Sequence, residues 1–230
     1  MTRGADSGCR ALEKDLLMSN PETGRPPVQN SDFWNQRYAA QAFVWTANAN
    51  RFVAEEVADL PPGRALDLAA GEGRNAVWLA EQGWQAHAVD FSDVAMKKCR
   101  RLAAERQVAE RVTCEVADLH DYVPTPDAYD LVLLIYLQIP QAELTPVIAR
   151  AAEAVAPGGT FLLVAHDSAN LKDGYGGPQN PDVLYTANEV LAALDDRLEV
   201  EKAGVVERPV ETDAGTRVAL DCLVRARRPC

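Results

Sequence analysis

RALDLAAGEGRNAVWL, residues 64–79, is the stretch from which the fold of this chain can be read. It opens with a short apolar run, Ala65-Leu66-Asp67-Leu68, after Pro-Pro-Gly, which is the pattern of a fully buried parallel strand. Gly71 and Gly73 follow, and apolar residues then recur at helical spacing. Glycines let a ligand approach the backbone, and the first turn of a helix presents unbonded N–H groups. The stretch therefore predicts a strand, a glycine loop and a helix that together bind a small ligand.

A second apolar run, residues 85–89, ends in Asp90, seventeen residues after Gly73. A carboxylate at this strand end can accept hydrogen bonds from the two hydroxyl groups of a ribose. Two nucleotide sites share this pattern. The dinucleotide loop G-x-G-x-x-G/A is satisfied by residues 71–76, whereas the S-adenosylmethionine (SAM) loop follows an acid at the end of the first strand, where Asp67 lies. The loop by itself does not decide between a dinucleotide and SAM as the ligand.

The rest of the chain alternates strands and helices. Further elements are expected as helices over 48–60, 92–106 and 141–155 and as strands over 112–117, 129–135 and 160–165. Five parallel strands with right-handed crossovers form a doubly wound α/β sheet, which binds ligands at the C-terminal ends of its strands. The polar residues at those ends are Asp67, Asp90, Asp118, Tyr136 and His166.

The C-terminal part has a different pattern. Residues 168–185 are rich in Gly, Pro and Asn, and a loop of this length often serves as a lid. A capping box, Thr186-x-x-Glu189, predicts a helix over 187–194.

Two strand-like runs, 198–206 and 218–226, are joined through the turn residues 211–216, which predicts an antiparallel hairpin. A dinucleotide fold would repeat the strand-helix unit instead, so the hairpin and Asp67 argue against a nicotinamide-dependent oxidoreductase.

The composition limits the kinds of partner. Lys and Arg number 23 against 34 Asp and Glu, a net charge of -11, so the basic footprint of a nucleic-acid-binding protein is missing. No apolar run approaches the roughly 20 residues of a membrane span, and residues 1–9 lack the apolar core of a signal peptide. Five scattered cysteines and three histidines predict no metal site and a reducing cytoplasm. We expect a small-molecule substrate, and the oligomeric state stays open.

The N-terminal segment divides into two parts. Residues 1–30 are rich in Gly, Ser, Asn and Pro and are expected to be a disordered tail, ahead of a single domain over 31–230. A short helix over 31–38 and a second helix precede the first strand as a helical cap. This segment can fold over the mouth of the cofactor site, where Trp45 and Asn50 are candidate contacts.

With these residues in hand, the chain from about Trp34 to its C-terminus resembles the class I SAM-dependent methyltransferases. The matching pieces come in the family's order and spacing: ALDLAAGEGRNAVWLA, AVDFS, VADL, YDLVLLIYL and AVAPGGTFLLVAHD. Within the class, GEGRNAVWLAEQGW, VLYTANEVLAAL and TDAGTRV are most similar to the tellurite-resistance and thiopurine methyltransferases, which modify small, soft nucleophiles such as thiols and chalcogen oxyanions. The resemblance implies a Rossmann-like, mostly parallel seven-stranded sheet with the C-terminal hairpin at its edge.

The resemblance also implies which residues hold SAM and its product, S-adenosylhomocysteine (SAH). The loop 71–73 would hold the methionine portion, Asp90 the ribose, Phe91 the adenine face, and Asp118 with Leu119 the adenine edge. The expected cofactor-binding residues are Trp45, Asp67, Ala69, Gly71, Gly73, Arg74, Asn75, Asp90, Phe91, Ser92, Ala117, Asp118, Leu119 and Ile135.

The family pattern is broken at two places. Ala69 stands where the first glycine of the usual loop would be, and the histidine of the tellurite enzymes falls near Val210 or Glu211. The second departure argues against the tellurite reaction.

Methyl transfer is an in-line displacement at a sulfonium carbon, so the protein mainly aligns donor and nucleophile and excludes water. If the nucleophile must lose a proton, His166 is the best-placed base, and Tyr136 is the second candidate for a catalytic role. A non-catalytic SAM-binding protein is the main alternative, and an NAD-dependent oxidoreductase is the other.

Overall fold

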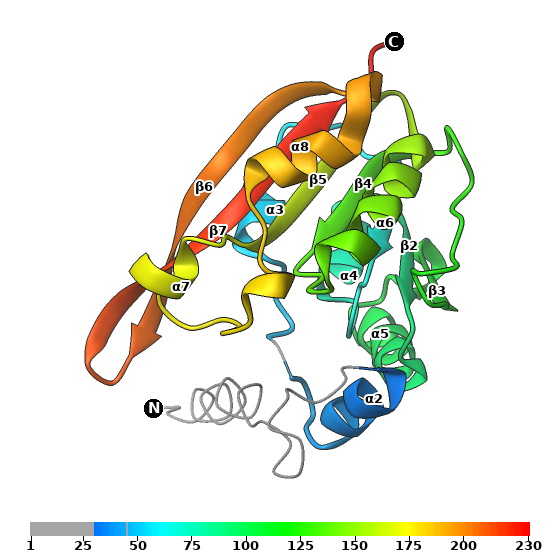
Figure 1. Ribbon diagram of the computed structural model, residues 1–230. Coiled ribbons are helices and arrows are strands. Elements are labelled where there is room, and N and C mark those ends of the chain that lie inside the picture. Colours follow the sequence, from blue (N-terminus) through cyan, green and yellow to red (C-terminus); the bar gives the residue numbers. More distant parts are fainter. Residues whose placement is uncertain (1–29, 45) are drawn as a thin grey trace.

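The computed structural model describes residues 30–44 and 46–230 (Figure 1). Trp45 and the expected tail, apart from Asn30, lie outside the described residues. The strands are β1 (Arg64–Leu68), β2 (Gln85–Asp90), β3 (Val112–Val116), β4 (Tyr129–Ile135), β5 (Val155–His166), β6 (Glu199–Thr212) and β7 (Gly215–Arg227). The α-helices are α2 (Ser31–Ala39), α3 (Arg51–Val57), α4 (Arg74–Glu81), α5 (Asp93–Glu105), α6 (Gln141–Ala154), α7 (Asn170–Asp173) and α8 (Ala187–Leu194). Short 3₁₀ helices are η1 (Ala109–Arg111), η2 (Pro181–Val183) and η3 (Asp195–Arg197).

The strands form one seven-stranded sheet in the order β3-β2-β1-β4-β5-β7-β6. The first five strands are parallel to one another, and β7 lies antiparallel between β5 and β6. The chain therefore reverses its direction of winding between β1 and β4, which is the point where open α/β sheets bind ligands. The expected Rossmann-like methyltransferase fold with a C-terminal hairpin is confirmed.

Helices cover both faces of the sheet, as Figure 1 shows with α6 and α8 in front and α3 and α4 behind. Alternate residues of the central strand β4 supply the two cores, because successive strand side chains point to opposite faces. Val132 and Leu134 pack with α6 and α8, whereas Leu131 and Leu133 pack with α3, α4 and α5. Among the described residues, no helix is long and apolar enough to cross a membrane.

Strand β5 begins earlier than predicted. Residues 156–159, Ala-Pro-Gly-Gly, separate the predicted helix from the predicted strand over 160–165, but the strand already starts at Val155 and runs through them. The pairing with β4 shifts register between Tyr129 and Leu131, which makes room for the extra residues. Gly158 and Gly159 also pair with the backbone of Arg228, so tertiary pairing overrides the turn signal.

The hairpin is longer than predicted, because β6 and β7 stay paired up to Thr212 and Gly215. The segment 168–185 is predicted as a loop, but it contains the short helices α7 and η2. The capping box before α8 is confirmed: the Glu189 carboxylate accepts a hydrogen bond from the Thr186 amide at 2.7 Å.

Lys98 of α5 is less exposed than its sequence surroundings suggest. The neighbouring basic residues Lys97, Lys98, Arg100 and Arg101 have the pattern of a solvated helix face, but the Lys98 side chain is only 18% exposed. Its ammonium forms an ion pair with the buried Glu72 carboxylate at 2.8 Å and donates to the carbonyl oxygens of Tyr38 and Gln41. Lys98 thus joins the N-terminal cap to the glycine loop.

Replacing Lys98 by methionine keeps the aliphatic stem and removes the charge that faces Glu72. Breaking a buried ion pair costs about 3–5 kcal/mol, so we expect urea denaturation to show a loss of about 3 kcal/mol in the free energy of unfolding. Lys97→Met is the matched control, because Lys97 is exposed and pairs with Asp93 within the same helix. That control should lose less than about 1 kcal/mol. Equal losses in the two variants would contradict a bracing role for Lys98.

Candidate functional site

The glycine loop connects β1 to α4 and depends on two residues without side chains. Gly71 and Gly73 have φ angles of +55° and +80°, a region that favours glycine. Gly73 is the N-cap of α4, and a Cβ atom there would lie 2.1 Å from Cys99 Sγ of α5. Both predicted glycines are therefore required by the backbone.

Asp90, at the end of β2, holds this loop in place. Its carboxylate accepts hydrogen bonds from the Gly71 amide at 2.8 Å and the Ser92 amide at 2.9 Å. Burial raises the pKa of Asp90 to about 6, although these two amides oppose the shift. Ser92 in turn caps α5, where its hydroxyl accepts from the Ala95 amide. One carboxylate thus joins the loop, β2 and α5.

Asp67 is a buried carboxyl that makes no hydrogen bond of good distance and angle with the described residues, although the Ala76 amide lies near it. It lies on β1 and is 1% exposed. Burial raises the pKa of Asp67 to about 7, and the nearby Ala76 amide and Arg74 guanidinium only partly oppose it. An unpaired buried acid of this kind is costly for the fold and is expected where a ligand supplies the partner.

Two residues other than glycine adopt left-handed backbone angles at the same edge of the sheet. Ala69 follows β1 with φ +56°, and Tyr136 follows the adjacent strand β4 with φ +55°. Such conformations cost about 1–3 kcal/mol each and tend to occur at functional sites. Ala69 therefore adopts a backbone conformation that normally favours glycine.

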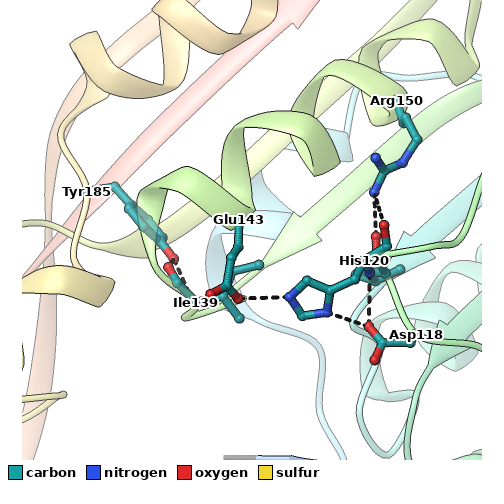
Figure 2. Close-up of polar contacts among 7 residues, drawn as sticks. Asp118, His120, Ile139, Glu143, Arg150 and Tyr185 are labelled. Carbon is teal, nitrogen blue, oxygen red and sulfur yellow. Dashed lines mark hydrogen bonds and ion pairs between the residues drawn. The ribbon is translucent and has the colours of Figure 1, made fainter.

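The expected adenine edge has a charged network that the sequence analysis missed (Figure 2). His120 bridges Asp118, at 2.6 Å, and Glu143 at the start of α6, at 2.8 Å. These contacts with Glu143 and Asp118 raise the pKa of His120. Arg150 of α6 donates to the carbonyl oxygens of Leu119 and His120. The network fixes the segment that follows β3.

Tyr185 braces the other side of this region, as Figure 2 also shows. Its hydroxyl accepts from the Ile139 amide at 2.8 Å and lies 3.1 Å from the Leu137 carbonyl oxygen. The side chain is buried and so supports the loop between β4 and α6.

A second polar cluster lies beyond the glycine loop, around Asp221 of β7. The Asp221 carboxylate is fully buried and lies 3.1 Å from His166 Nδ1, 2.7 Å from Arg208 Nε and 2.6 Å from the Tyr136 hydroxyl. Burial alone would raise the pKa of Asp221, but these three contacts outweigh it and hold the pKa below its ordinary value. The structure therefore brings the two predicted catalytic residues, His166 and Tyr136, onto one carboxylate.

Arg208 and Asp221 were absent from the sequence analysis. The signal that could have found Asp221 is its place in the apolar run VALDCLV of β7, because a charged residue inside a buried strand needs a partner. Nothing comparable marks His120, which follows a strand in an ordinary polar loop.

The remaining expected residues have varied surroundings. Asn75 is buried, and its side-chain oxygen accepts from the Asn50 amide at 2.9 Å, so it braces the segment before α3. Ile135 belongs to the core, Phe91 is partly exposed at the end of β2, and the Ala117 amide donates to the Asp90 carbonyl oxygen. Within the described residues, no cluster of three His, Cys, Asp or Glu side chains could hold a metal ion.

Comparison with known proteins shows similarity to methyltransferases over part of the chain. Residues 65–159 match the family model described as a methyltransferase domain. A stretch of 118 residues is 26% identical to 2-heptyl-1-hydroxyquinolin-4(1H)-one methyltransferase of Mycobacteroides abscessus, covering 50% of this chain and 52% of that protein. Another of 123 residues is 29% identical to Hemagglutinin 1 of Eikenella corrodens, covering 51% and 39%. The chain thus spans about half or less of the length of these curated relatives.

Among solved structures, TehB from Haemophilus influenzae has the same fold. Its TM-score is 0.66 at 17% identity, over 86% of this chain and 66% of that one. The strand order is that of the Rossmann-like methyltransferase fold. The match over residues 65–159 is to a family whose methyl donor is SAM, and it favours SAM over a dinucleotide as the ligand of the glycine loop.

The charge of Asp67 can be tested by Asp67→Asn. With a pKa of about 7, the folded protein keeps a proton that the unfolded chain loses near pH 4, so stability falls as the pH rises through this window. The variant lacks this effect. Between about pH 5 and pH 8, the free energy of unfolding measured in urea should therefore fall less steeply with pH in the variant than in the wild type. The two slopes should differ by up to about 1.4 kcal/mol per pH unit.

Asp93→Asn is the control for this experiment, since Asp93 pairs with Lys97 at the surface and its pKa is lowered by that contact. It should show the wild-type slope. Identical slopes for Asp67→Asn and the wild type would mean that Asp67 is ionised throughout the range.

Proposed function

We propose that this protein transfers the methyl group of SAM to a small-molecule nucleophile, a thiol, a chalcogen oxyanion or a similar group. The observation that carries the proposal is the cluster of His166, Asp221, Tyr136 and Arg208 at the strand ends beside the glycine loop. The cluster offers His166 as a proton acceptor and Arg208 as a cation, at the place where the molecule to be methylated would meet SAM.

The residues of the loop fit the cofactor by charge. The methionine portion of SAM carries an ammonium and a carboxylate, so its site needs one acidic and one basic side chain. Asp67 makes no hydrogen bond of good distance and angle, and Arg74 has no hydrogen bond or ion pair with any described residue, although it lies close enough to Asp67 for their charges to interact. We assign Asp67 to the ammonium and Arg74 to the carboxylate. Asp90 would bind the ribose, and Phe91, Asp118 and Leu119 the adenine.

When bound, SAM supplies an electrophilic methyl group on a sulfonium sulfur. The chain has to orient the acceptor, exclude water and take up a proton where the acceptor carries one. His166 Nδ1 lies 3.1 Å from Asp221 Oδ1, although the angles between them do not make a hydrogen bond. A small turn of the imidazole would let Nδ1–H donate to this carboxylate, and Nε2 would then accept a proton from the methyl acceptor. Asp221 is then a positioning residue, and Arg208 neutralises it.

Three further features support a small acceptor. The loop 168–185 reaches the cluster, because a Cβ atom on Gly177 would lie 3.0 Å from His166 Nδ1. The net charge of -11 disfavours binding to nucleic acid. The resemblance to the thiopurine and tellurite-resistance branch favours a soft nucleophile.

The protein's location is a separate point. The cysteines that the structure describes are free thiols, which favours the reducing cytoplasm.

The test measures SAH release with a panel of small thiols, phenols and selenite. We expect turnover with at least one acceptor. His166→Gln should lower kcat by about 100-fold for an acceptor that is protonated at the assay pH, and should have little effect on one that is already ionised. His87→Gln is the control, because His87 contacts Tyr129 and Glu115 instead of this cluster. SAM binding without turnover on any acceptor, or turnover on RNA alone, would overturn the proposal.

A further inference from the structure

Two cysteines away from the polar cluster around Asp221, Cys99 and Cys114, have their sulfur atoms 3.2 Å apart. Cys99 lies on α5 and is fully buried, whereas Cys114 lies on β3 and is partly exposed. Because β3 is the edge strand of the sheet, a small solute can reach Cys114 from solvent. The pair thus joins one accessible thiol to one protected thiol.

Cys99 also contacts the cofactor loop. Its sulfur occupies the space that a side chain at Gly73 would fill, and its Cβ and Cα atoms lie 2.7 Å and 3.2 Å from the same point. Gly73 has a φ of +80° and starts α4, so the shape of the loop depends on this contact. A change at the Cys99 sulfur is therefore transmitted directly to the SAM loop.

Cys114 has the features of a reactive thiol. The hydrogen bond with Cys99 lowers its pKa, and the Arg100 guanidinium adds to this effect, while partial burial opposes it. Arg100 is held close by a hydrogen bond to the Cys114 carbonyl oxygen at 2.8 Å. Thiolates react with peroxides and thiols do not, so Cys114 is the group that reacts first.

We propose that Cys99 and Cys114 form a reversible disulfide in response to hydroperoxides, and that this disulfide weakens SAM binding. The Cys114 thiolate attacks an oxygen of the hydroperoxide and breaks its O–O bond, which gives a sulfenic acid. The leaving alkoxide or hydroxide takes up the proton that the Cys114 thiol had released and departs as an alcohol or water. The Cys99 sulfur then attacks the sulfenic sulfur, loses its proton and expels water as the S–S bond forms. Two thiols are oxidised and one hydroperoxide is reduced. A thiol reductant reverses the change.

The coupling to SAM follows from the distances. A disulfide brings the sulfurs from 3.2 Å to about 2.05 Å. The Cys99 sulfur must turn toward β3, which removes its support from Gly73. The loop amides then lose the arrangement that Asp90 holds at Gly71.

The test treats the purified full chain with equimolar hydrogen peroxide and maps disulfides by mass spectrometry without reduction. We expect a Cys99–Cys114 bond, SAM affinity at least fivefold weaker by calorimetry, faster hydrogen exchange at residues 71–75, and recovery with dithiothreitol. Cys114→Ser should keep wild-type SAM affinity and lose the response. Cys230→Ser, at an exposed cysteine outside the pair, should respond as the wild type does.

Two results would overturn the proposal. One is the absence of the Cys99–Cys114 bond after peroxide treatment, and the other is its formation with unchanged SAM affinity and unchanged exchange in the loop. None of these measurements needs a methyl acceptor, so they stand apart from the test of the acceptor class. Hydrogen exchange reports on the loop even without ligand.

Discussion

The close approach of α5 to the glycine loop is the constraint on which the site depends. Gly73 has no side chain, so Cys99 can pack directly beneath the first turn of α4. The Asp90 carboxylate then fastens the loop from the other side through the Gly71 amide. Backbone N–H groups stay directed at the edge of the sheet because both supports are rigid and buried. A residue larger than glycine would push the helix and the loop apart.

Two buried carboxyl groups at this edge show how surroundings set chemical roles. Asp67 makes no hydrogen bond of good distance and angle with the described residues, and burial raises its pKa to about 7. Asp221 is just as inaccessible but meets His166, Arg208 and Tyr136, and its pKa is lowered. The first group is suited to a cationic ligand that arrives from outside. The second is already neutralised and is suited to hold a neighbouring imidazole in one orientation.

The hairpin is where the sheet and the site are combined. Its strand β7 pairs with β5 and brings Asp221 opposite His166, in register with the last residue of that strand. The outer strand β6 adds Arg208 to the same carboxylate. The hairpin therefore closes the edge of the sheet and also supplies Asp221 and Arg208, two of the four residues of the polar cluster around Asp221.

The sequence by itself determined the order of strands and helices, the glycine loop and the acids at the strand ends, because these follow from local apolar patterns and backbone requirements. It could not show that Lys98 is buried against Glu72, that His120 bridges Asp118 and Glu143, or that Cys99 touches Cys114. Those contacts join residues from separate elements. Only the packing of helices on the sheet and the register of β5 with β7 decided them, since charged and thiol side chains take their roles from their neighbours.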